Sequence, residues 1–320
     1  MVPGPELLAR ARLLVAPELS ASLVRKLERI TGRDAEPLAD EVPGGGPLLC
    51  VGAELPGSVR AVERLVWFHS VNAGTDPLLA AGPWPAGALL TRTVGRMGER
   101  IAQYVVGWVL AECQSVPEYV VQHARAEWRR LPAELVAGQT ALVYGAGRIG
   151  GAVAELLRRC GVRTVGVGRT AWSGPPPVGF DRVIGAEEDA EAEAEELAGA
   201  RWVVGALPLT GATEGFFGAG RFAAVRGATF VNVGRGATVD LAALEDALRG
   251  GGVRRAVLDV LAQEPAAPDD PVWRLPRTVI TSHSAGITAD EDVAVDFAAC
   301  WEAVAAGRRP ELAVDVGRGY

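Results

Sequence analysis

Three side chains with acid–base or carboxylate-binding chemistry each follow an apolar segment in the second half of the chain. Arg235 lies in VNVGRG, Glu264 lies just beyond LDV, and His283 lies in TSHSAG. Each segment has the length and composition of a buried strand, and open α/β sheets bind their ligands at the carboxyl ends of such strands. The three residues therefore form a candidate catalytic set.

These three types of side chain suit chemistry on a 2-oxo acid. A guanidinium such as that of Arg235 can bind the carboxylate and polarise the C2 carbonyl. An imidazole such as that of His283 can deliver a proton near neutral pH, and a carboxylate bonded to it fixes its tautomer and stabilises its charged form. Hydride would come from a nicotinamide cofactor, which the protein has to orient.

Two other histidines compete for the catalytic role. His69 ends the apolar segment RLVWFHS near a glycine turn and could approach a cleft. His123 lies in a polar helical stretch and is expected at the surface. A single histidine is more often structural than catalytic, so the assignment of His283 depends on its companions.

A glycine-rich turn provides the cofactor signal. GAGRIG supplies Gly145, Gly147 and Gly150 directly after one apolar strand and at the opening of a helix. The first glycine permits a tight turn, the second lets a pyrophosphate approach the backbone, and the third lets helix and strand pack closely. The helix N-terminus then offers N–H groups to the phosphates. We expect dinucleotide binding; the alternative is a glycine-rich turn without a ligand.

The residues after the next strand predict which dinucleotide is preferred. An NAD site usually carries a carboxylate here for the ribose 2′-OH, but none lies between Gly161 and Asp181. Arg169, with Thr170 and Ser173 nearby, could instead pair with a 2′-phosphate. We expect NADP(H) to be preferred, with NAD(H) possible. The alternative is that Arg169 is only a surface arginine.

The elements that must position these residues read as a doubly wound α/β sheet. Between residues 139 and 283, short apolar runs alternate with helix-like stretches long enough for crossover connections. Helical periodicity is clearest directly after the first run, at Ile149, Val153, Leu156 and Leu157. The expected strands are 141–145, 164–168, 202–207, 229–234, 256–260 and 278–282. The acidic stretch 186–200 is expected to be a solvated helix between two of them.

The first ninety residues repeat this α/β rhythm more weakly and indicate a second, smaller α/β domain. An apolar helix at 100–112 would lead from it into the sheet domain. Beyond His283 only one helical stretch is expected, at about 290–306, and it could pack back on the smaller domain. We therefore expect a discontinuous substrate domain of residues 1–92 and 290–320, and a dinucleotide-binding domain of residues 93–289.

Composition excludes several other classes of protein. The chain has 320 residues and a formal net charge of −7, so phosphate-driven binding of nucleic acid is not expected. No apolar run is long enough to span a membrane, and the N-terminus lacks the pattern of a signal peptide, so a cytoplasmic protein is expected. Four widely spaced cysteines, without a CxxC pair, indicate neither a metal site nor a disulfide framework.

Taken together, the motifs resemble those of the D-isomer-specific 2-hydroxyacid dehydrogenases. The resemblance runs nearly from end to end and implies a Rossmann cofactor domain with a flavodoxin-like substrate domain. Six segments carry it in the family's order: NAGTD (72–76), GAGRIG (145–150), LPLTGAT (207–213), VNVGRGATVD (231–240), LDVLAQEP (258–265) and SHSAG (282–286).

The resemblance assigns roles to individual residues. It implies Arg235 as the substrate-binding electrophile, Glu264 as the partner of the histidine, and His283 as the acid/base. Asp259 is the expected contact to the nicotinamide carboxamide. The substrate carboxylate is expected on backbone N–H groups of Val71, Asn72, Ala73 and Gly74. The other expected cofactor contacts are Gly145, Gly147, Arg148, Ile149, Gly150, Arg169, Thr170, Leu207, Pro208, Thr213, Val233, Gly234, Ala285 and Gly286, together with His283 itself.

Within the family, the chain is most similar to the NADPH-dependent glyoxylate/hydroxypyruvate reductases, which implies formation of an (R)-2-hydroxy acid. Arg92, GRTAWSG (168–174) and the ending VDVGRGY (314–320) support this. Gln103, Gly95 and Ser284 depart from the common pattern. Arg92 and Arg96 could serve a more anionic 2-oxo acid, such as a phosphonate analogue, or be merely solvated.

Two further questions stay open at the level of sequence. Relatives with sensing or corepressor roles share this fold, so a non-catalytic scaffold that senses NAD(P) is an alternative. The stretch EYVVQHARAEWRR (118–130) resembles the arm that relatives use in dimer contacts, which implies a homodimer with Trp128 in the interface. The alternative for Trp128 is a core position under a loop.

Overall fold

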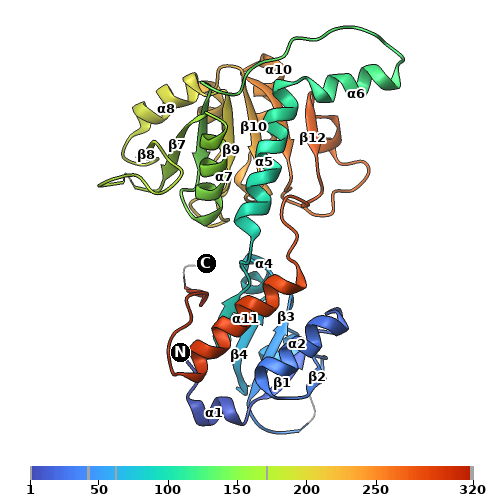
Figure 1. Ribbon diagram of the computed structural model, residues 1–320, viewed down its shortest axis with the longest axis vertical. Coiled ribbons are helices and arrows are strands. Elements are labelled where there is room, and N and C mark those ends of the chain that lie inside the picture. The colour runs from blue at the N-terminus through green and yellow to red at the C-terminus, as the bar shows by residue number, and fades with distance from the viewer. Residues whose placement is uncertain (1, 42–43, 62, 171, 318–320) are drawn as a thin grey trace. The chain divides into compact units, whose positions relative to one another are not determined.

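The computed structural model describes residues 2–41, 44–61, 63–170 and 172–317 (Figure 1). The chain divides into two compact units. The smaller unit comprises Met1–Met97 and Thr288–Tyr320, and the larger unit comprises Gly98–Ile287. Residues 1, 42–43, 62 and 318–320 of the expected domain of residues 1–92 and 290–320 lie outside the described part of the chain.

The larger unit contains a seven-stranded, wholly parallel sheet in the order β12-β11-β10-β9-β6-β7-β8. The first strand of the unit, β6, lies where the order reverses, so the predicted doubly wound sheet is confirmed. Its strands are β6 (Thr140–Tyr144), β7 (Arg163–Gly168), β8 (Arg182–Gly185), β9 (Trp202–Gly205), β10 (Ala228–Asn232), β11 (Val253–Leu258) and β12 (Thr278–Ile280).

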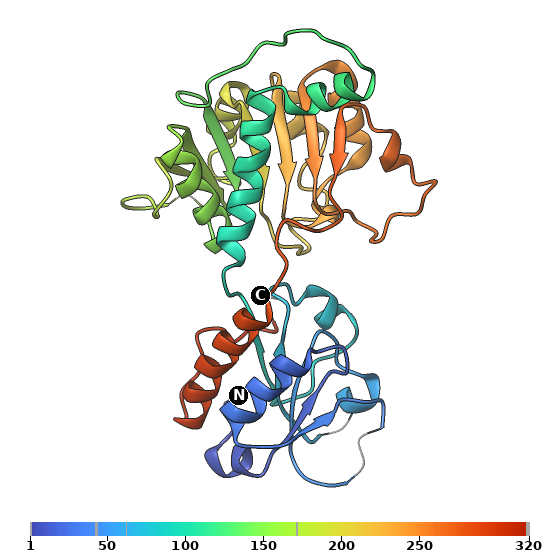
Figure 2. The same cartoon turned by 45° about the vertical axis from the view of Figure 1, so that its right-hand side comes forward.

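Helices cover both faces of this sheet (Figure 2). They bury its apolar strands on both sides, which explains why those strands read as continuous apolar runs in the sequence. These helices are α5 (Met97–Cys113), α6 (Val116–Ala124), α7 (Arg148–Arg159), α8 (Ala190–Gly199), α9 (Ala219–Ala224) and α10 (Leu241–Gly250), with 3₁₀ turns at Gly236–Thr238 and Pro271–Arg274.

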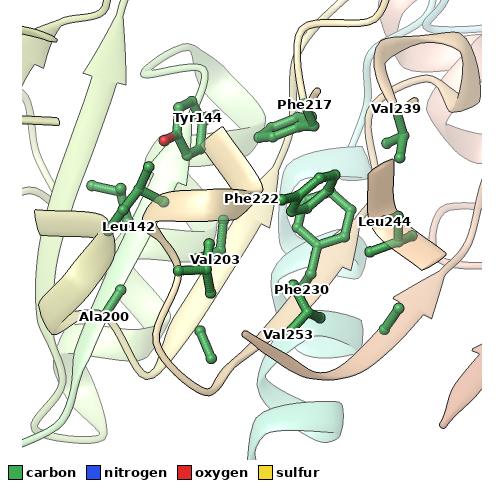
Figure 3. Packing of buried hydrophobic residues seen from close by; sticks show 14 of the residues in the cluster. Leu142, Tyr144, Ala200, Val203, Phe217, Phe222, Phe230, Val239, Leu244 and Val253 are labelled. Atoms are coloured by element: carbon green, nitrogen blue, oxygen red, sulfur yellow. The ribbon is translucent and has the colours of Figure 1, made fainter. Parts of the chain in front are cut away.

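The core on one face of the sheet is built around aromatic rings (Figure 3). The rings of Phe217 and Phe230 meet edge to face with centroids 5.0 Å apart. The acidic stretch forms α8, but it is not wholly solvated as predicted, because Glu193 is buried and points into this core. Its carboxylate accepts hydrogen bonds from Tyr144 and Arg221, which offset the cost of burying its charge.

The smaller unit contains a five-stranded parallel sheet in the order β2-β1-β3-β4-β5. This is the flavodoxin-like order that the resemblance implied. Helix α11 packs along α2, and burial of Val293, Phe297, Cys300 and Val304 holds it in this unit. The elements are β1 (Arg12–Val15), β2 (Ala35–Pro37), β3 (Leu48–Gly52), β4 (Leu65–Ser70), β5 (Leu89–Arg92), α1 (Pro5–Ala9), α2 (Ala21–Thr31), α3 (Gly57–Arg60), α4 (Asp76–Ala80) and α11 (Asp290–Ala305).

Two features are absent from the described residues. None of the helices is long and apolar enough to cross a membrane. In the same residues, no group of three or more His, Cys, Asp or Glu side chains is placed to hold a metal ion.

Candidate active site

The glycine turn after β6 has the geometry that a bound pyrophosphate requires. Gly145 has φ +99°, and a Cβ there would lie 2.7 Å from the carbonyl oxygen of Ala206. A Cβ on Gly150 would lie 1.9 Å from the carbonyl oxygen of Gly145, so the helix packs directly on the turn. Neither position accepts a larger residue without a shift of the backbone.

The space above this turn is open. A Cβ on Gly147 would meet nothing within 4 Å, and Gly147 is the N-cap of α7 without a capping side chain. The first N–H groups of α7 include those of Ile149 and Gly150, which lack acceptors within the helix, as at every helix start. These groups and the helix dipole fit the phosphates of a dinucleotide.

Loops after two neighbouring strands line the same edge of the sheet. Gly234, after β10, approaches the turn after β9 so closely that a Cβ would lie 2.5 Å from the carbonyl oxygen of Leu207. Thr213 closes that turn, because its hydroxyl donates to Pro208 O at 2.6 Å and accepts from Thr210 N at 2.8 Å. Val233 is buried beneath them.

Arg169 and Thr170 follow β7 directly, and both are exposed. Strand β7 is the neighbour of β6 in the sheet, so both residues lie at the same edge as the glycine turn. Ser173 is also exposed.

The structure brings His283 and Glu264 together. Nδ1 of His283 lies 2.7 Å from Oε2 of Glu264, and the second carboxylate oxygen accepts a hydrogen bond from Leu261 N at 2.7 Å. The backbone thus holds the carboxylate, and the carboxylate orients the imidazole with Nε2 pointing away. Half of the His283 side chain is exposed, so Nε2 is open to a ligand.

Arg235 lies on the loop after β10, two strands from β12 in the sheet. Asn232 fixes this loop, because its amide accepts from Gly234 N and donates to Arg235 O, each at 3.1 Å. The guanidinium donates to Gly234 O at 2.8 Å and is partly exposed.

Gly236 sets the spacing between two loops of the site, a role that was not predicted from the sequence. A Cβ at this position would lie 1.8 Å from the carbonyl carbon of Leu261, so the Arg235 loop rests directly on the loop that carries Glu264. The signal was present in the sequence as the second glycine of the GRG triplet, immediately after the arginine.

The backbone of the histidine loop is held in a conformation that is rare for its residue types. Ser282 and His283 have φ +55° and +56°, in the left-handed region that such residues seldom adopt. Asp259, which is 3% exposed, accepts hydrogen bonds from three successive backbone N–H groups. Its backbone carbonyl accepts from His283 N at 2.6 Å, and its carboxylate accepts from Ser284 N at 2.8 Å and from Ala285 N at 3.1 Å.

The expected substrate loop lies in the smaller unit, directly after β4. Val71 N donates to Gly52 O at 3.1 Å, and Asn72 N donates to the Ser70 hydroxyl at 3.2 Å. Two of the four expected N–H donors are thus engaged within the unit, which leaves Ala73 and Gly74. The loop is also held by Arg92, whose guanidinium donates to Ala73 O at 3.1 Å.

The competing histidines have other roles. His69 is fully buried in β4, where its ring nitrogens lie 2.7 Å and 3.1 Å from the hydroxyls of Thr91 and Thr93. Burial lowers the pKa of His69 to about 3, so its ring is neutral at neutral pH. His123 is exposed on α6.

Comparison with known proteins now gives the class. Residues 106–285 match the family model described as D-isomer specific 2-hydroxyacid dehydrogenase, NAD binding domain. The chain belongs to the D-isomer specific 2-hydroxyacid dehydrogenase family, and the resemblance read from its motifs is confirmed. It is therefore an oxidoreductase of the NAD(P)-dependent class that this family comprises.

Individual relatives refine this picture. An uncharacterized protein of Streptomyces coelicolor is 58% identical over 274 residues, which cover 86% of this chain and 96% of that protein. Glyoxylate/hydroxypyruvate reductase A of Serratia proteamaculans is 32% identical over 80% of this chain and 82% of its own length. A Xanthobacter autotrophicus family member, solved in complex with NADPH and MES, has a TM-score of 0.84 at 29% identity, covering 97% of this chain and all of that one.

Proposed function

We propose that this enzyme reduces a small 2-oxo acid of the glyoxylate or hydroxypyruvate type with NADPH and releases the 2-hydroxy acid, in the (R) configuration where C2 becomes a stereocentre. The observation that carries this proposal is the His283–Glu264 pair, 2.7 Å between Nδ1 and Oε2, in the same unit as a glycine turn that fits a dinucleotide. The similarity to glyoxylate/hydroxypyruvate reductase A supports the choice of substrate class.

Each group of the catalytic set has a separate task in this proposal. Arg235 binds the substrate carboxylate and polarises the C2 carbonyl. A dinucleotide, when bound, would supply the hydride to C2. His283 delivers the proton from Nε2 to the developing alkoxide, and Glu264 stabilises the imidazolium before that transfer. One hydride and one proton are added, so the carbonyl becomes an alcohol, while NADPH would become NADP⁺ and the ring of His283 becomes neutral.

The cofactor would be held by residues of the larger unit. The first turn of α7, entered through Gly147, would bind the pyrophosphate, and the loops ending β9 and β10 would line the rest of the site. Arg169 would pair with the 2′-phosphate, because it is exposed at the end of the strand next to the glycine turn. The NADPH complex of the Xanthobacter relative is consistent with this preference.

The loop after β4 is the carboxylate-binding loop that we propose for the smaller unit. Ala73 and Gly74 are the remaining N–H donors of the loop for a carboxylate, and Arg92 fixes the loop through Ala73 O. The same guanidinium is the observation that favours a second candidate, a more anionic 2-oxo acid, because Arg92 adds positive charge beside the loop. Ala285, Gly286 and Asp259 would line the nicotinamide side.

A homodimer is part of the proposal. In the segment that follows α6, the exposed surface of Trp128 and of Leu135 is 103% and 84% of the reference value for a fully exposed residue of each type. Trp128 is therefore not a core tryptophan. A groove of about 770 Å³ beside α5 and α6 is lined by Trp108, Val116 and Val121, among others. Burial of this apolar surface would drive association. Light scattering should give a dimer mass, and Trp128→Glu should shift it toward the monomer.

A panel of 2-oxo acids assayed with NADPH and with NADH tests the proposal. We expect the largest kcat/KM for glyoxylate or hydroxypyruvate with NADPH. A larger value for a phosphonate-bearing 2-oxo acid would support the second candidate. If no substrate in the panel oxidises either cofactor, although both bind, a scaffold that senses the dinucleotide would replace the reductase.

A further inference from the structure

The hydrogen bonds that hold the histidine loop continue to a helix on the face of the sheet. The hydroxyl of Thr281 lies 2.6 Å from Asp259 Oδ1 and 2.7 Å from the phenolic oxygen of Tyr104 on α5. Asp259 in turn accepts hydrogen bonds from the backbone N–H groups of residues 283–285. A continuous chain of hydrogen bonds thus joins α5 to the loop that carries His283.

The directions of these bonds follow from the number of protons available. A carboxylate only accepts, so the single hydroxyl proton of Thr281 points to Asp259. The oxygen of Thr281 must then accept from Tyr104, whose phenol is the donor. Burial raises the pKa of Tyr104 to about 12, so the phenol keeps its proton at neutral pH.

The two ends of this chain of hydrogen bonds, α5 and the histidine loop, differ in how firmly their backbone is held. Tyr104 lies in a 17-residue helix whose neighbouring side chains, including Ile101, Val105 and Val109, are buried. At the other end, Ser282 and His283 hold positive φ values, which are unfavourable for residues other than glycine. Such a conformation persists only where the surroundings impose it, and Asp259 is the residue that does so here.

We propose that Tyr104 is a positioning residue for His283: through Thr281 it fixes the carboxylate of Asp259, which in turn holds residues 282–285 in the conformation that pairs His283 with Glu264. The structural part of this inference is independent of the substrate. Its catalytic part rests on the proposed function, because it needs His283 to act as the proton donor.

Tyr104→Phe isolates the hydroxyl, because it keeps the ring and its edge-on contact with Trp108. The net loss of one hydrogen bond predicts a fall in kcat of about twofold to tenfold. KM for the 2-oxo acid should stay constant, because Arg235 would bind its carboxylate. Tyr119→Phe is the matched control, since that hydroxyl accepts from Leu131 N on the segment after α6.

Thr281 offers a rescue experiment at the middle of the chain. Thr281→Val removes the hydroxyl at constant size and should lower kcat at least as far as Tyr104→Phe, whereas Thr281→Ser keeps the hydroxyl and should restore kcat. The double variant Tyr104→Phe/Thr281→Val should be no slower than Thr281→Val, because both changes break the same chain. Additive losses would overturn the proposal.

Hydrogen–deuterium exchange gives a readout that needs no activity. In Tyr104→Phe, the amides of residues 283–285 should exchange several-fold faster than in the unmodified enzyme, while those of β6 should not change. Unchanged exchange at 283–285 would overturn the proposal, as would an equal increase in β6, which would show general destabilisation. If the enzyme reduced none of the 2-oxo acids tested, the proposed function would fail, and this experiment would still decide the role of Tyr104.

Discussion

Two histidines lie at the ends of strands in the two units, and their surroundings give them opposite properties. His69 ends β4 of the smaller unit, is fully buried, and has both ring nitrogens beside threonine hydroxyls. His283 follows β12 of the larger unit, is half exposed, and has one ring nitrogen bonded to a carboxylate and the other open.

The comparison shows what makes a histidine suitable for proton transfer. At His69, full burial beside neutral threonine hydroxyls disfavours the charged ring, whereas His283 has a carboxylate partner and a half-exposed side chain. Both residues lie near the end of a strand, so position along a strand does not distinguish a catalytic from a structural histidine. The hydrogen-bond partner of the ring does distinguish them.

The largest expected effect is that of removing the ring of His283. His283→Ala should lower kcat by about 100-fold to 10,000-fold, because no other group can deliver the proton. The dissociation constant of NADPH, measured by fluorescence titration, should change little. His123→Ala is the control, since that ring is exposed on α6 and should leave turnover unchanged. Normal turnover of the His283 variant would end the assignment.

Arg235 extends the comparison from proton donors to carboxylate-binding groups. Arg235→Lys keeps the charge but cannot form the bidentate pair, so kcat/KM for the 2-oxo acid should fall by about tenfold to a hundredfold. Arg226→Lys, on an exposed side chain that contacts only backbone carbonyls, is the matched control. Equal kinetics for Arg235→Lys and the unmodified enzyme would show that Arg235 does not bind the substrate.

The buried His69 should affect the pH dependence of the free energy of unfolding rather than catalysis. Its pKa is about 3 in the folded chain, against an ordinary value of about 6.5. Between these values only the unfolded chain binds the proton, so the free energy of unfolding should fall as the pH decreases from about 6.5 toward 3, by up to about 1.4 kcal/mol per pH unit.

Urea denaturation across this pH range, with His69→Gln as the comparison, checks this expectation. The variant should be less stable than the unmodified protein at pH 7, because the hydroxyls of Thr91 and Thr93 lose a well-placed partner. Its stability should depend less steeply on pH. An identical slope in both proteins would mean that His69 is charged in the folded state.

The smallest effect is expected at the exposed end of β7. Arg169→Ala should raise KM for NADPH by about fivefold to tenfold and leave KM for NADH nearly unchanged, because only NADPH carries the 2′-phosphate. Arg182→Ala is a suitable control. Arg182 begins β8, so it lies at the amino ends of the parallel strands, whereas Arg169 and the glycine turn lie at their carboxyl ends. Equal losses with both cofactors would exclude a contact between Arg169 and the 2′-phosphate.

Much of the fold could be predicted from the sequence, because central parallel strands are buried on both faces and read as unbroken apolar runs. The strands that escaped prediction are β2, β5 and β8, which are short and lie at sheet edges. Residues 35–37 of β2 contain no buried side chain, so no apolar run marks them. In β2, the local pattern fails because burial is incomplete.

The features of the site also differ in whether local sequence could predict them. The glycine turn is visible in sequence because its three positions are local, and the contact between His283 and Glu264 was expected from the family's motifs. The carboxylate bonds of Asp259 to the loop at 284–285, and the close approach of Gly236 to Leu261, join residues about 25 positions apart. Such contacts depend on the order of strands in the sheet, which local sequence does not encode.

A crystal structure of the enzyme with NADP⁺ and oxamate, an unreactive analogue of a 2-oxo acid, would show whether His283 and Arg235 act on one carbonyl oxygen. We expect the amide carbonyl oxygen of oxamate to lie about 2.6–3.2 Å from Nε2 of His283 and from the guanidinium of Arg235. We also expect Glu264 to keep its hydrogen bond to Nδ1. Oxamate bound with its carbonyl beyond reach of His283 would show that His283 is not the proton donor.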